Sequence, residues 1–552
     1  MTFFFFFLAN FFLGDLTIFY PAFKSEAPLS SQLFKGTIIA LDTSSITVRL
    51  RAKQFNDSLF RNYEFWNMEH DSLDSGFNVL FRSLFQFCNY QLPERKKFLS
   101  LKPPAPSKPK EWPHHQQLTD EQNRIMGKII SAEDYFLLWG PPGTGKTSVI
   151  VKYLLQYLIN QTDEQILLLA YTNRAVDEVC HALIAAGLPD FLRIGSKYST
   201  DLRYRNNLLN TLTADITSRI DLQRAILKYR VVVGTISSVL GKPELFELKK
   251  FDRLIIDEAT QVLEPMVAGL LPGFQKVLLI GDHHQLAAVV TQGQQERLVN
   301  DESLISIGVS DLGNSYFERI FSRCEEEGWS WAYDKLSYQG RMHEDVMQFP
   351  SDQFYGGMLK ILPGNQNIQQ SAPLHFEKIP DDLLSTYLST RRVLFFPVRS
   401  KELFNSKINV AESKFVAEVI EKLIQLYEVN NKTLSLSDVG VITPFRAQIA
   451  QIKTELESRN IFLDQLLIDT VERFQGGAKN IIIISLCVNS ENQLDNLINL
   501  SSDHIDRKLN VALTRAKDQV IMIGDPQALA KNPVYSAFMD RFTCAYQAFI
   551  DQ

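Results

Sequence analysis

Apolar and polar positions follow two different patterns along the chain. Residues 36–52, GTIIALDTSSITVRLRA, alternate apolar and polar side chains around a turn-like DTSS, which is typical of a β-hairpin. From residue 135 onward, short apolar runs alternate with stretches of helical character. The first pattern predicts a small β-rich domain near the N-terminus, and the second predicts an α/β fold built on parallel strands.

The apolar runs form two series. The first lies between Tyr135 and Asp282 and reads YFLLW, ILLLA, VVVG, LIIDE and VLLIGD. The second reads VLFFP from Val393, VGVIT from Val439, LLIDT from Leu466, IIIIS from Ile481 and QVIMIGD from Gln519. We therefore expect two parallel, doubly wound sheets in tandem, with ligands beyond the carboxyl ends of their strands.

Composition marks the boundary between the two patterns. The stretch from Lys102 to Pro113, KPPAPSKPKEWP, is rich in proline and lysine and can form neither a helix nor a central strand. A chain of 552 residues is also too long for a single core. The predicted division is a β-rich accessory domain over 1–101, a linker over 102–115, a first α/β lobe over 116–331 and a second lobe over 332–552.

The Phe-rich start, MTFFFFFLANFFLG, needs to be distinguished from a targeting signal. It lacks the basic region and the small-residue cleavage site of a signal peptide, and its apolar stretch is short for a membrane span. We expect a buried element or the ragged start of a truncated chain rather than a membrane anchor.

Charge and cysteine content narrow the classes of function. The formal net charge is −6, so binding of nucleic acid would need a local channel rather than the whole outer surface. The five cysteines lie far apart, with neither a CxxC pair nor a histidine cluster at metal-ligand spacing. This pattern predicts a cytoplasmic protein in a reducing compartment, without structural zinc or an iron–sulfur cluster.

A phosphate-binding loop follows the first apolar run of the α/β part. The sequence after YFLLW is GPPGTGKT, and the next stretch, SVIVKYLLQYLI, is typical of a helix. In such a loop, backbone N–H groups and the helix N-terminus bind phosphate oxygens, the lysine reaches the β- and γ-phosphates, and the hydroxyl ligates Mg²⁺. The predicted binding residues are Gly140, Pro141, Pro142, Gly143, Thr144, Gly145, Lys146 and Thr147.

Two carboxylates at the end of LIIDE complete a candidate site for hydrolysis of ATP with Mg²⁺. Asp257 would hold the metal ion through its shell, and Glu258 would orient or deprotonate the attacking water. The alternative is that both residues cap the following helix. The P-loop favours the catalytic interpretation, but it does not distinguish kinases, GTPases and transporter ATPases from other members of its class.

The remaining segments that follow strands resemble the motifs of superfamily 1 helicases. In chain order they are LTDEQNRI, GPPGTGKT, AYTNRAVDEV, VVVGTISS, IIDEATQ, GDHHQL, YQGRMHEDVMQFPSDQFYGG, VITPFRAQ, TVERFQGG and LNVALTRAK. They are most similar to the branch that contains the nonsense-mediated-decay helicase and the replication and DNA-repair helicase-nucleases. The resemblance implies two tandem RecA-like P-loop domains with one ATP site between them.

The resemblance implies roles for further residues around the nucleotide. Gln122 matches the glutamine that binds the adenine edge, and Gln285 matches the one that senses the γ-phosphate. Arg341 and Arg515 of the second lobe match arginines that reach across the cleft to the γ-phosphate, a task suited to a planar, always charged guanidinium. Gly476, in the motif TVERFQGG, is also expected to contact the nucleotide by this resemblance. In isolation, the glutamine and arginine side chains would more often be solvated surface residues.

Polar side chains that follow strands in both lobes predict a path for single-stranded nucleic acid. Such groups bind phosphate and sugar oxygens without reading bases. For each hydroxyl or amide the alternative is a helix N-cap. The expected path consists of Thr172, Asn173, Thr235, Ser237, Thr443, Arg446 and Thr470.

One position departs from the family pattern. The family motif commonly has a glutamate that bonds the nucleotide ribose, and this chain has Ala478 there, within FQGGA. The departure would weaken the sugar contact and relax nucleotide choice, unless Lys479 or another group substitutes. GDHHQL lacks the base-stacking aromatic residue of the opposite-polarity branch, which favours the 5′ to 3′ branch by resemblance.

The predicted function is that of an ATP-dependent helicase or translocase, a nucleic-acid-stimulated ATPase that moves 5′ to 3′ on single-stranded nucleic acid. DNA is favoured over RNA, with a monomeric motor, no membrane association, and nuclease or repair proteins as candidate partners. The alternative is an ATP-gated remodeller of ribonucleoproteins, or a nucleic-acid clamp without processive unwinding. A scaffold that does not hydrolyse ATP is disfavoured, because Lys146, Asp257, Glu258 and Arg515 are all present.

Overall fold

The computed structural model describes residues 2–4, 11, 15–22, 32–41, 45–51, 54, 58–71, 75–290, 292–364, 370–399, 407–488, 490, 493–501 and 503–546. Of the Phe-rich start, only residues 2–4 and 11 fall within this description, so the expectation for that segment lies largely outside it. Among the described residues, no helix is long and apolar enough to cross a membrane.

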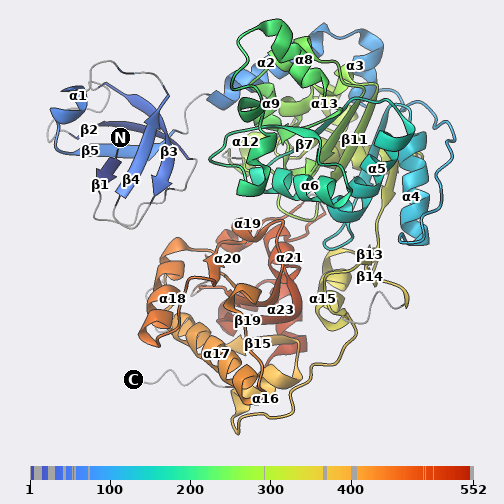
Figure 1. The fold of residues 1–552 in the computed structure, drawn as a ribbon. Helices are drawn as coiled ribbons and strands as arrows, with labels where there is room; N and C mark the ends of the chain where they lie inside the picture. Colours follow the sequence, from blue (N-terminus) through green and yellow to red (C-terminus); the bar gives the residue numbers. More distant parts are fainter. Residues whose placement is uncertain are drawn as a thin grey trace.

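The N-terminal domain is an antiparallel sheet, as the alternating pattern predicted. Its strand order is β1-β4-β3-β2-β5, and the predicted hairpin is formed by β3 and β4. The side chains of Phe19, Phe34, Ile38, Ile46 and Val48 form its core. Figure 1 shows the sheet as a separate body beside the first lobe. The bounds are β1 (Thr2–Phe4), β2 (Leu16–Pro21), β3 (Phe34–Leu41), β4 (Ser45–Leu50), α1 (Ser58–Arg61) and β5 (Trp66–His70).

Two helices within residues 1–101, the range assigned to the β-rich domain, pack on the first lobe instead. They are α2 (Ser75–Asn89) and α3 (Leu92–Phe98), and Figure 1 shows them beside that lobe. The backbone N–H of Gly269 donates to Ser83 Oγ over 3.0 Å, and the Tyr316 hydroxyl donates to the carbonyl oxygen of Phe98 over 2.9 Å. The division at residue 101 is therefore corrected: the sheet ends by residue 71, and the helices contact lobe 1 through Ser83 and Phe98, while Phe77, Phe81 and Phe85 of α2 stay exposed.

The proline-rich stretch at 102–115 runs along the surface of lobe 1. The N–H of Ala105 donates to Asp134 Oδ2 over 2.6 Å, and the N–H of Lys108 donates to the carbonyl oxygen of Ser131 over 3.0 Å. Trp112 Nε1 donates to Asn123 Oδ1 over 3.0 Å. The segment has no helix or strand, as its composition predicted, but it is tied down rather than a free spacer.

Lobe 1 is built on a parallel sheet with the order β12-β6-β11-β10-β7-β9-β8. Successive residues of each strand face opposite sides, so Leu137 joins one apolar cluster and Phe136 the other. The predicted boundary at residue 331 placed β12 in lobe 2. The strand belongs to lobe 1, because it pairs with β6. The strands are β6 (Tyr135–Trp139), β7 (Ile166–Ala170), β8 (Phe191–Ile194), β9 (Val231–Thr235), β10 (Arg253–Asp257), β11 (Lys276–Gly281) and β12 (Tyr333–Lys335).

Helices cover both faces of this sheet. The main ones are α4 (Asp120–Ser131), α5 (Lys152–Gln161), α6 (Asn173–Ala185), α8 (Arg219–Leu227), α9 (Ile236–Leu240) and α14 (Tyr316–Glu326). Each begins with a polar N-cap or continues from the P-loop turn. For example, Thr119 and Gln122 form a reciprocal capping box at the start of α4.

Lobe 2 repeats the plan with a parallel sheet of order β15-β19-β18-β16-β17. The strands are β15 (Val393–Pro397), β16 (Val439–Ile442), β17 (Leu467–Asp469), β18 (Lys479–Ser485) and β19 (Ala516–Gly524). The main helices are α15 (Glu344–Phe354), α16 (Leu383–Thr390), α17 (Val410–Val429), α18 (Arg446–Ser458), α19 (Val471–Phe474), α20 (Leu494–Leu497), α21 (Arg507–Leu513) and α23 (Pro533–Phe542). A short parallel pair, β13 (Tyr338–Gln339) and β14 (Lys360–Ile361), lies beside the junction of the lobes. The predicted tandem of two doubly wound sheets is confirmed.

The two lobes meet through buried polar contacts made by α21. Arg507 Nη2 lies 2.9 Å from Glu318 Oε2 of α14, and Arg507 Nε donates to the carbonyl oxygen of His283 over 2.9 Å. Asn510 Nδ2 donates to the carbonyl oxygen of His284 over 2.7 Å. One apolar cluster also contains residues of both lobes, so the lobes share part of a core.

Replacing Gly269 by alanine tests the docking of α2 on lobe 1. A Cβ at this position would overlap the backbone of Ser83, which cannot move aside as a flexible side chain can. We expect Gly269→Ala to lower the free energy of unfolding by about 1–3 kcal/mol, measured by urea denaturation. Gly127→Ala in α4 is the matched control, because its Cβ would meet only Trp112 Cβ at 3.9 Å. Equal unfolding midpoints for the two variants would contradict the proposed docking.

Candidate active site

The P-loop connects β6 to a helical turn that continues into α5. Gly143 and Gly145 have φ angles of +77° and +80°, a left-handed conformation that side chains with a Cβ rarely adopt. A Cβ at Gly143 would also stand 2.6 Å from Arg341 Cβ of lobe 2. Lys146 Nζ donates to the carbonyl oxygen of Gly140, so the ammonium group lies across the loop where phosphate oxygens would bind.

Thr147 and Asp257 are in direct contact at the end of β10. The Thr147 hydroxyl donates to Asp257 Oδ2, and Asp257 Oδ1 accepts from the N–H of Glu258 over 2.9 Å. Burial, with the nearby charge of Glu258, raises the pKa of Asp257 to about 6. A hydroxyl and a carboxylate in this arrangement are oxygen ligands suited to Mg²⁺, whose charge would hold Asp257 ionised. The two residues therefore fit the predicted metal site.

Glu258 is held in an unusual conformation at the same strand end. Its φ is +53°, and its Oε2 is buried without a hydrogen-bond partner among the described residues. A buried, unpartnered carboxylate oxygen is costly unless a ligand or water completes it. The side chain lines the cleft between the lobes, which places it where an attacking water would be bound.

Gln285 connects the nucleotide site to lobe 2. Its Nε2 donates to Asp282 Oδ2 over 2.6 Å, and its Oε1 accepts from Arg515 Nη2 over 3.1 Å. Asp282 also accepts from Trp139 Nε1 over 2.9 Å and from the Tyr355 hydroxyl over 2.8 Å. The amide of Gln285 is therefore oriented from one side by lobe 1 and contacted from the other by lobe 2.

Two arginines of lobe 2 face the P-loop without a carboxylate hydrogen-bonded to either guanidinium among the described residues. Arg341 Nη1 donates to the carbonyl oxygen of Thr514 over 3.2 Å, and Arg515 Nη1 donates to that of Gly477 over 3.3 Å. Burial and the neighbouring charge of Arg341 lower the pKa of Arg515 to about 9. Two desolvated cations placed side by side favour an anion between them, such as the γ-phosphate.

These groups line one cavity of about 1480 Å³ between the lobes. Of the predicted nucleotide residues, it is lined by Pro141, Pro142, Gly143, Thr144, Gly145, Lys146, Thr147, Glu258, Gln285, Arg341, Gly476 and Arg515. Gly140, Asp257 and Gln122 do not line this cavity, and Asp257 lines the second cavity between the lobes instead. Gln122 Oε1 accepts from the N–H of Thr119 in the capping box, while its Nε2 lies 3.9 Å from where a Cβ of Gly145 would stand.

Ala478 lines the same cavity and supplies no polar group to a ribose. Lys479, considered as a substitute, donates from Nζ to the carbonyl oxygen of Ser437 within lobe 2 and does not line the cavity. The expected glutamate therefore has no replacement at the neighbouring position.

The predicted nucleic-acid residues follow strands that are neighbours within each sheet. In lobe 1, Thr172 follows β7 and Thr235 is the last residue of β9. Both are N-caps, accepting from the N–H groups of Ala175 and Ser238 over 3.1 Å. Asn173 and Ser237 are each in the first turn of the capped helices. In this structure the two threonines act as N-caps, which was the alternative to nucleic-acid contact. A capping hydroxyl can still contact a phosphate.

The lobe 2 members of the path also lie side by side. Thr443 follows β16 and Thr470 follows β17, and the N–H of Thr443 donates to the carbonyl oxygen of Asp469 over 3.2 Å. The Thr443 hydroxyl is buried without a hydrogen-bond partner among the described residues, and Arg446 is exposed at the start of α18. A second cavity of about 1420 Å³ between the lobes is lined by Thr172 but by none of the other six.

Sequence reasoning missed two side chains that separate the two cavities. Arg174 and Glu178, one turn apart on α6, line both cavities together with Glu258 and Gly476. Arg174 Nε lies 3.7 Å from Glu178 Oε1, and Arg174 Nη1 donates to the carbonyl oxygen of Arg473 in lobe 2 over 3.1 Å. Their spacing of four residues in NRAVDEV was the available signal.

Comparison with known proteins identifies the two lobes. A model described as "AAA domain" matches residues 117–220 and 206–292, and a second "AAA domain" model matches residues 312–527. A DNA replication ATP-dependent helicase/nuclease of Arabidopsis thaliana is 27% identical over 87% of this chain and 34% of its own length. Its counterpart in Gallus gallus is 29% identical over 75% of this chain and 37% of its own length.

Another relative is named for a different process. A regulator of nonsense transcripts 1 homolog of Neurospora crassa is 27% identical over 75% of this chain and 38% of its own length. The chain thus spans little more than a third of the length of these relatives. A solved arterivirus nonstructural protein 10 (helicase) with DNA, 14% identical, aligns with a TM-score of 0.34 over 73% of this chain and 63% of that chain.

Glu178 allows a test of the cavity wall through pH. Burial, reinforced by Glu258 and Asp257 and opposed by Arg174, raises the pKa of Glu178 from its ordinary value of 4.5 to about 7. Between these values the folded protein holds a proton that the unfolded chain releases, so stability falls as pH rises from about 4.5 to 7. We expect Glu178→Gln to flatten this dependence and, because the side chain is 42% exposed, to stabilise the protein at pH 8 by about 1 kcal/mol.

The measurement is the urea midpoint at pH 5, 6, 7 and 8 without divalent cations. Glu457→Gln, at the exposed end of α18, removes the same charge away from the cleft and should leave the pH dependence intact. Parallel pH profiles of the wild type and Glu178→Gln would show that Glu178 is not desolvated.

Proposed function

The chain belongs to the superfamily 1 helicases, and on that premise we propose that it couples ATP hydrolysis between its two lobes to movement along single-stranded nucleic acid. The observation that carries the proposal is the split site. Lys146, Thr147 and Glu258 belong to lobe 1, while Arg341 and Arg515 reach the same cavity from lobe 2. Hydrolysis at such a site must change the contact between the lobes.

We assign the roles within the site as follows. Lys146 and the P-loop would bind the phosphates, and Thr147 and Asp257 would hold Mg²⁺, which would neutralise phosphate charge. Glu258 orients and deprotonates the attacking water, and Arg341 and Arg515 stabilise negative charge on the γ-phosphate. Because Arg515 contacts Gln285 directly, loss of the γ-phosphate would change the position of the loop after β11, which is hydrogen-bonded to α21.

The nucleic-acid path runs over the carboxyl ends of the strands in both lobes. Thr172 with Thr235, and Thr443 with Thr470, lie at the ends of neighbouring strands and give one pair on each lobe, flanked by Asn173, Ser237 and Arg446. Thr235 and Thr443 are buried in the present arrangement, so a strand would reach them only after the lobes move. Such pairs bind backbone oxygens of a strand without regard to its sequence. Opening and closing of the cleft would move the two pairs relative to one another, which produces a step.

We also propose the finer properties of this motor. It moves 5′ to 3′, because GDHHQL lacks the base-stacking aromatic residue of the opposite-polarity branch. DNA is favoured over RNA, because the relatives include DNA replication helicase/nucleases. It acts as a monomer, since the described chain holds both halves of the site. The five cysteines, all among the described residues, are thiols rather than disulfides, which supports a reducing, intracellular location.

Replacement of Glu258 by glutamine tests the catalytic assignment. The amide keeps the size of the side chain but cannot accept the proton of water, so we expect nucleic-acid-stimulated ATPase activity to fall about 10²- to 10⁴-fold with ATP binding retained. Glu247→Gln, an exposed glutamate of lobe 1 paired with Arg219, is the matched control and should keep full activity. Unchanged hydrolysis in Glu258→Gln would remove this residue from the mechanism.

Duplexes with single-stranded tails test movement. We expect unwinding of 5′-tailed DNA in single-turnover assays, with slower unwinding of 5′-tailed RNA and none of 3′-tailed duplexes. ATPase activity is measured on the same tails. Hydrolysis without strand displacement on any substrate would favour the ATP-gated clamp or remodeller over the helicase.

A further inference from the structure

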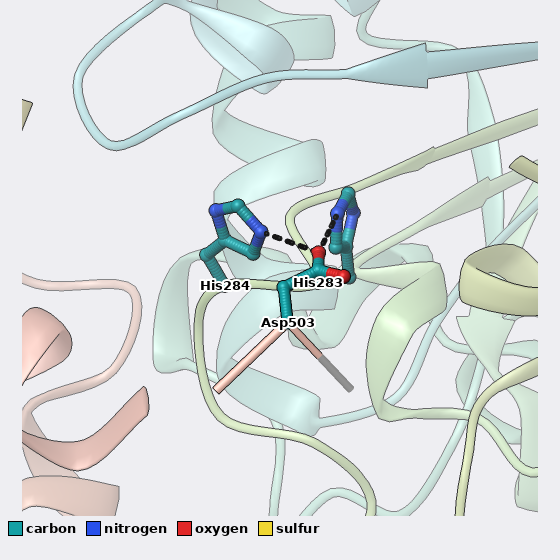
Figure 2. Close-up of side chains that lie close together, drawn as sticks. All are labelled: His283, His284 and Asp503. Atoms are coloured by element: carbon teal, nitrogen blue, oxygen red, sulfur yellow. Dashed lines mark hydrogen bonds and ion pairs between the residues drawn. The ribbon is translucent and has the colours of Figure 1, made fainter. Parts of the chain in front are cut away.

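Two histidines of lobe 1 and one aspartate of lobe 2 converge at the lobe junction (Figure 2). His283 and His284 stand directly before Gln285, and Asp503 precedes α21 by a few residues. Nε2 of His284 lies 3.3 Å from Asp503 Oδ2, and Nε2 of His283 lies 3.9 Å from the same atom. One nitrogen of each ring and one carboxylate oxygen all lie within 4.8 Å of one another. In Figure 2 both rings point their Nε2 edges at the carboxylate.

The histidine rings are buried and short of hydrogen bonds. Their side chains are 8% and 9% exposed. Within the described part of the chain, Nδ1 of each ring has no hydrogen-bond partner, and the 3.9 Å distance leaves Nε2 of His283 outside hydrogen-bond range as well. The Nδ1 atoms are not the atoms that face Asp503, so an ion held by the two Nε2 atoms would supply a partner to Nε2 of His283 only.

The surrounding structure fixes both rings. The His283 ring lies 4.7 Å from the Trp139 ring and 5.6 Å from the Phe321 ring, and the His284 ring lies 5.0 Å from Trp139. Their backbone carbonyl oxygens accept from Arg507 and Asn510. A ligand at the Nε2 atoms would therefore meet a preorganised pair rather than mobile surface histidines.

The chemistry of the three groups suits a cation. Each offers one ligand atom, and these atoms face one another between the lobes. Imidazole nitrogens and a carboxylate oxygen are ligands that first-row transition metals prefer, whereas Mg²⁺ and Ca²⁺ prefer oxygen alone.

We propose that His283, His284 and Asp503 form an inter-lobe site for one divalent transition-metal ion of the Zn²⁺ class. Bonds of about 2.0–2.1 Å in a tetrahedron place neighbouring ligand atoms about 3.3 Å apart. The separation of His284 and Asp503 already has this value. Asp503 is 61% exposed and can move the remaining half ångström toward His283, and solvent can supply the fourth ligand.

Such an ion would tie the lobes together beside the nucleotide site. His284 is adjacent to Gln285, and Asp503 lies close before the helix that carries Arg507 and Asn510. Metal binding would therefore hold α21 against the loop after β11 and slow the opening of the cleft. This regulatory consequence rests on the proposed function, whereas the metal site itself does not.

Co²⁺ is the probe for the site, because its visible absorption reports ligand number and geometry. Titration of tag-free, chelator-treated wild-type protein should give saturable visible bands with one ion per chain, displaced by Zn²⁺. Asp503→Asn and His284→Gln should each weaken Co²⁺ binding at least about tenfold. Asp495→Asn, an exposed aspartate of α20 in the same lobe, removes an equal charge and should bind as the wild type does.

The pattern of variants decides the outcome. Bands that are absent from the wild type, or that persist unchanged in Asp503→Asn and His284→Gln, overturn the site, leaving only a histidine–aspartate hydrogen bond or binding by other histidines. Asp503 is exposed, so its variant should fold normally, and the far-ultraviolet circular dichroism spectrum and unfolding midpoint verify this.

A parallel ATPase assay tests the regulatory consequence. Stoichiometric Zn²⁺ should reduce the turnover of the wild type and of Asp495→Asn several-fold, reversibly on chelation, and should leave Asp503→Asn unaffected. Equal inhibition of all three proteins overturns the regulatory link while the Co²⁺ spectra still report the site. Absence of ATPase activity in every protein would instead count against the proposed function.

Discussion

The site depends on one contact, between α21 of lobe 2 and the loop that follows β11 in lobe 1. Arg507 and Asn510 donate to the backbone of His283 and His284, and Arg515 donates to Gln285. These donors are buried, so separation of the lobes must rehydrate them or leave them unpaired. Directional hydrogen bonds thus specify how the lobes meet, which apolar packing alone would leave loosely defined.

The same contact makes nucleotide binding inseparable from the arrangement of the lobes. Arg341 and Arg515 are desolvated cations held near one another, an arrangement that is unfavourable until an anion lies between them. On the other side, Glu258 and Asp257 place two carboxyl groups beside the P-loop, where a divalent cation would favour their ionised form. The arginines of lobe 2 and the carboxyl groups of lobe 1 would thus both be stabilised by a nucleotide bound with a cation.

Helix α6 forms part of the boundary between the two cavities, which the sequence motifs did not predict. Its Arg174 and Glu178 form part of the wall of both cavities, and Arg174 also donates to the carbonyl oxygen of Arg473 in α19 of lobe 2. A shift of this helix or of the loop at Gly476 would alter both cavities at once. This shared wall offers a physical route for coupling between nucleotide and nucleic acid, in addition to the Gln285–Arg515 contact.

The sequence by itself determined the α/β class, the two parallel sheets, the N-terminal hairpin and the P-loop between β6 and α5. Each of these depends on short-range patterns, namely strand alternation, apolar runs and glycine spacing, which a linear reading can detect. Only the tertiary structure decided that α2 and α3 pack on lobe 1, that Thr172 and Thr235 cap helices, and that Lys479 lies away from the cavity. It alone brought Asp503 to His284 across 219 positions of sequence. These outcomes depend on which distant surfaces become buried together, and that information is distributed over contacts no local pattern contains.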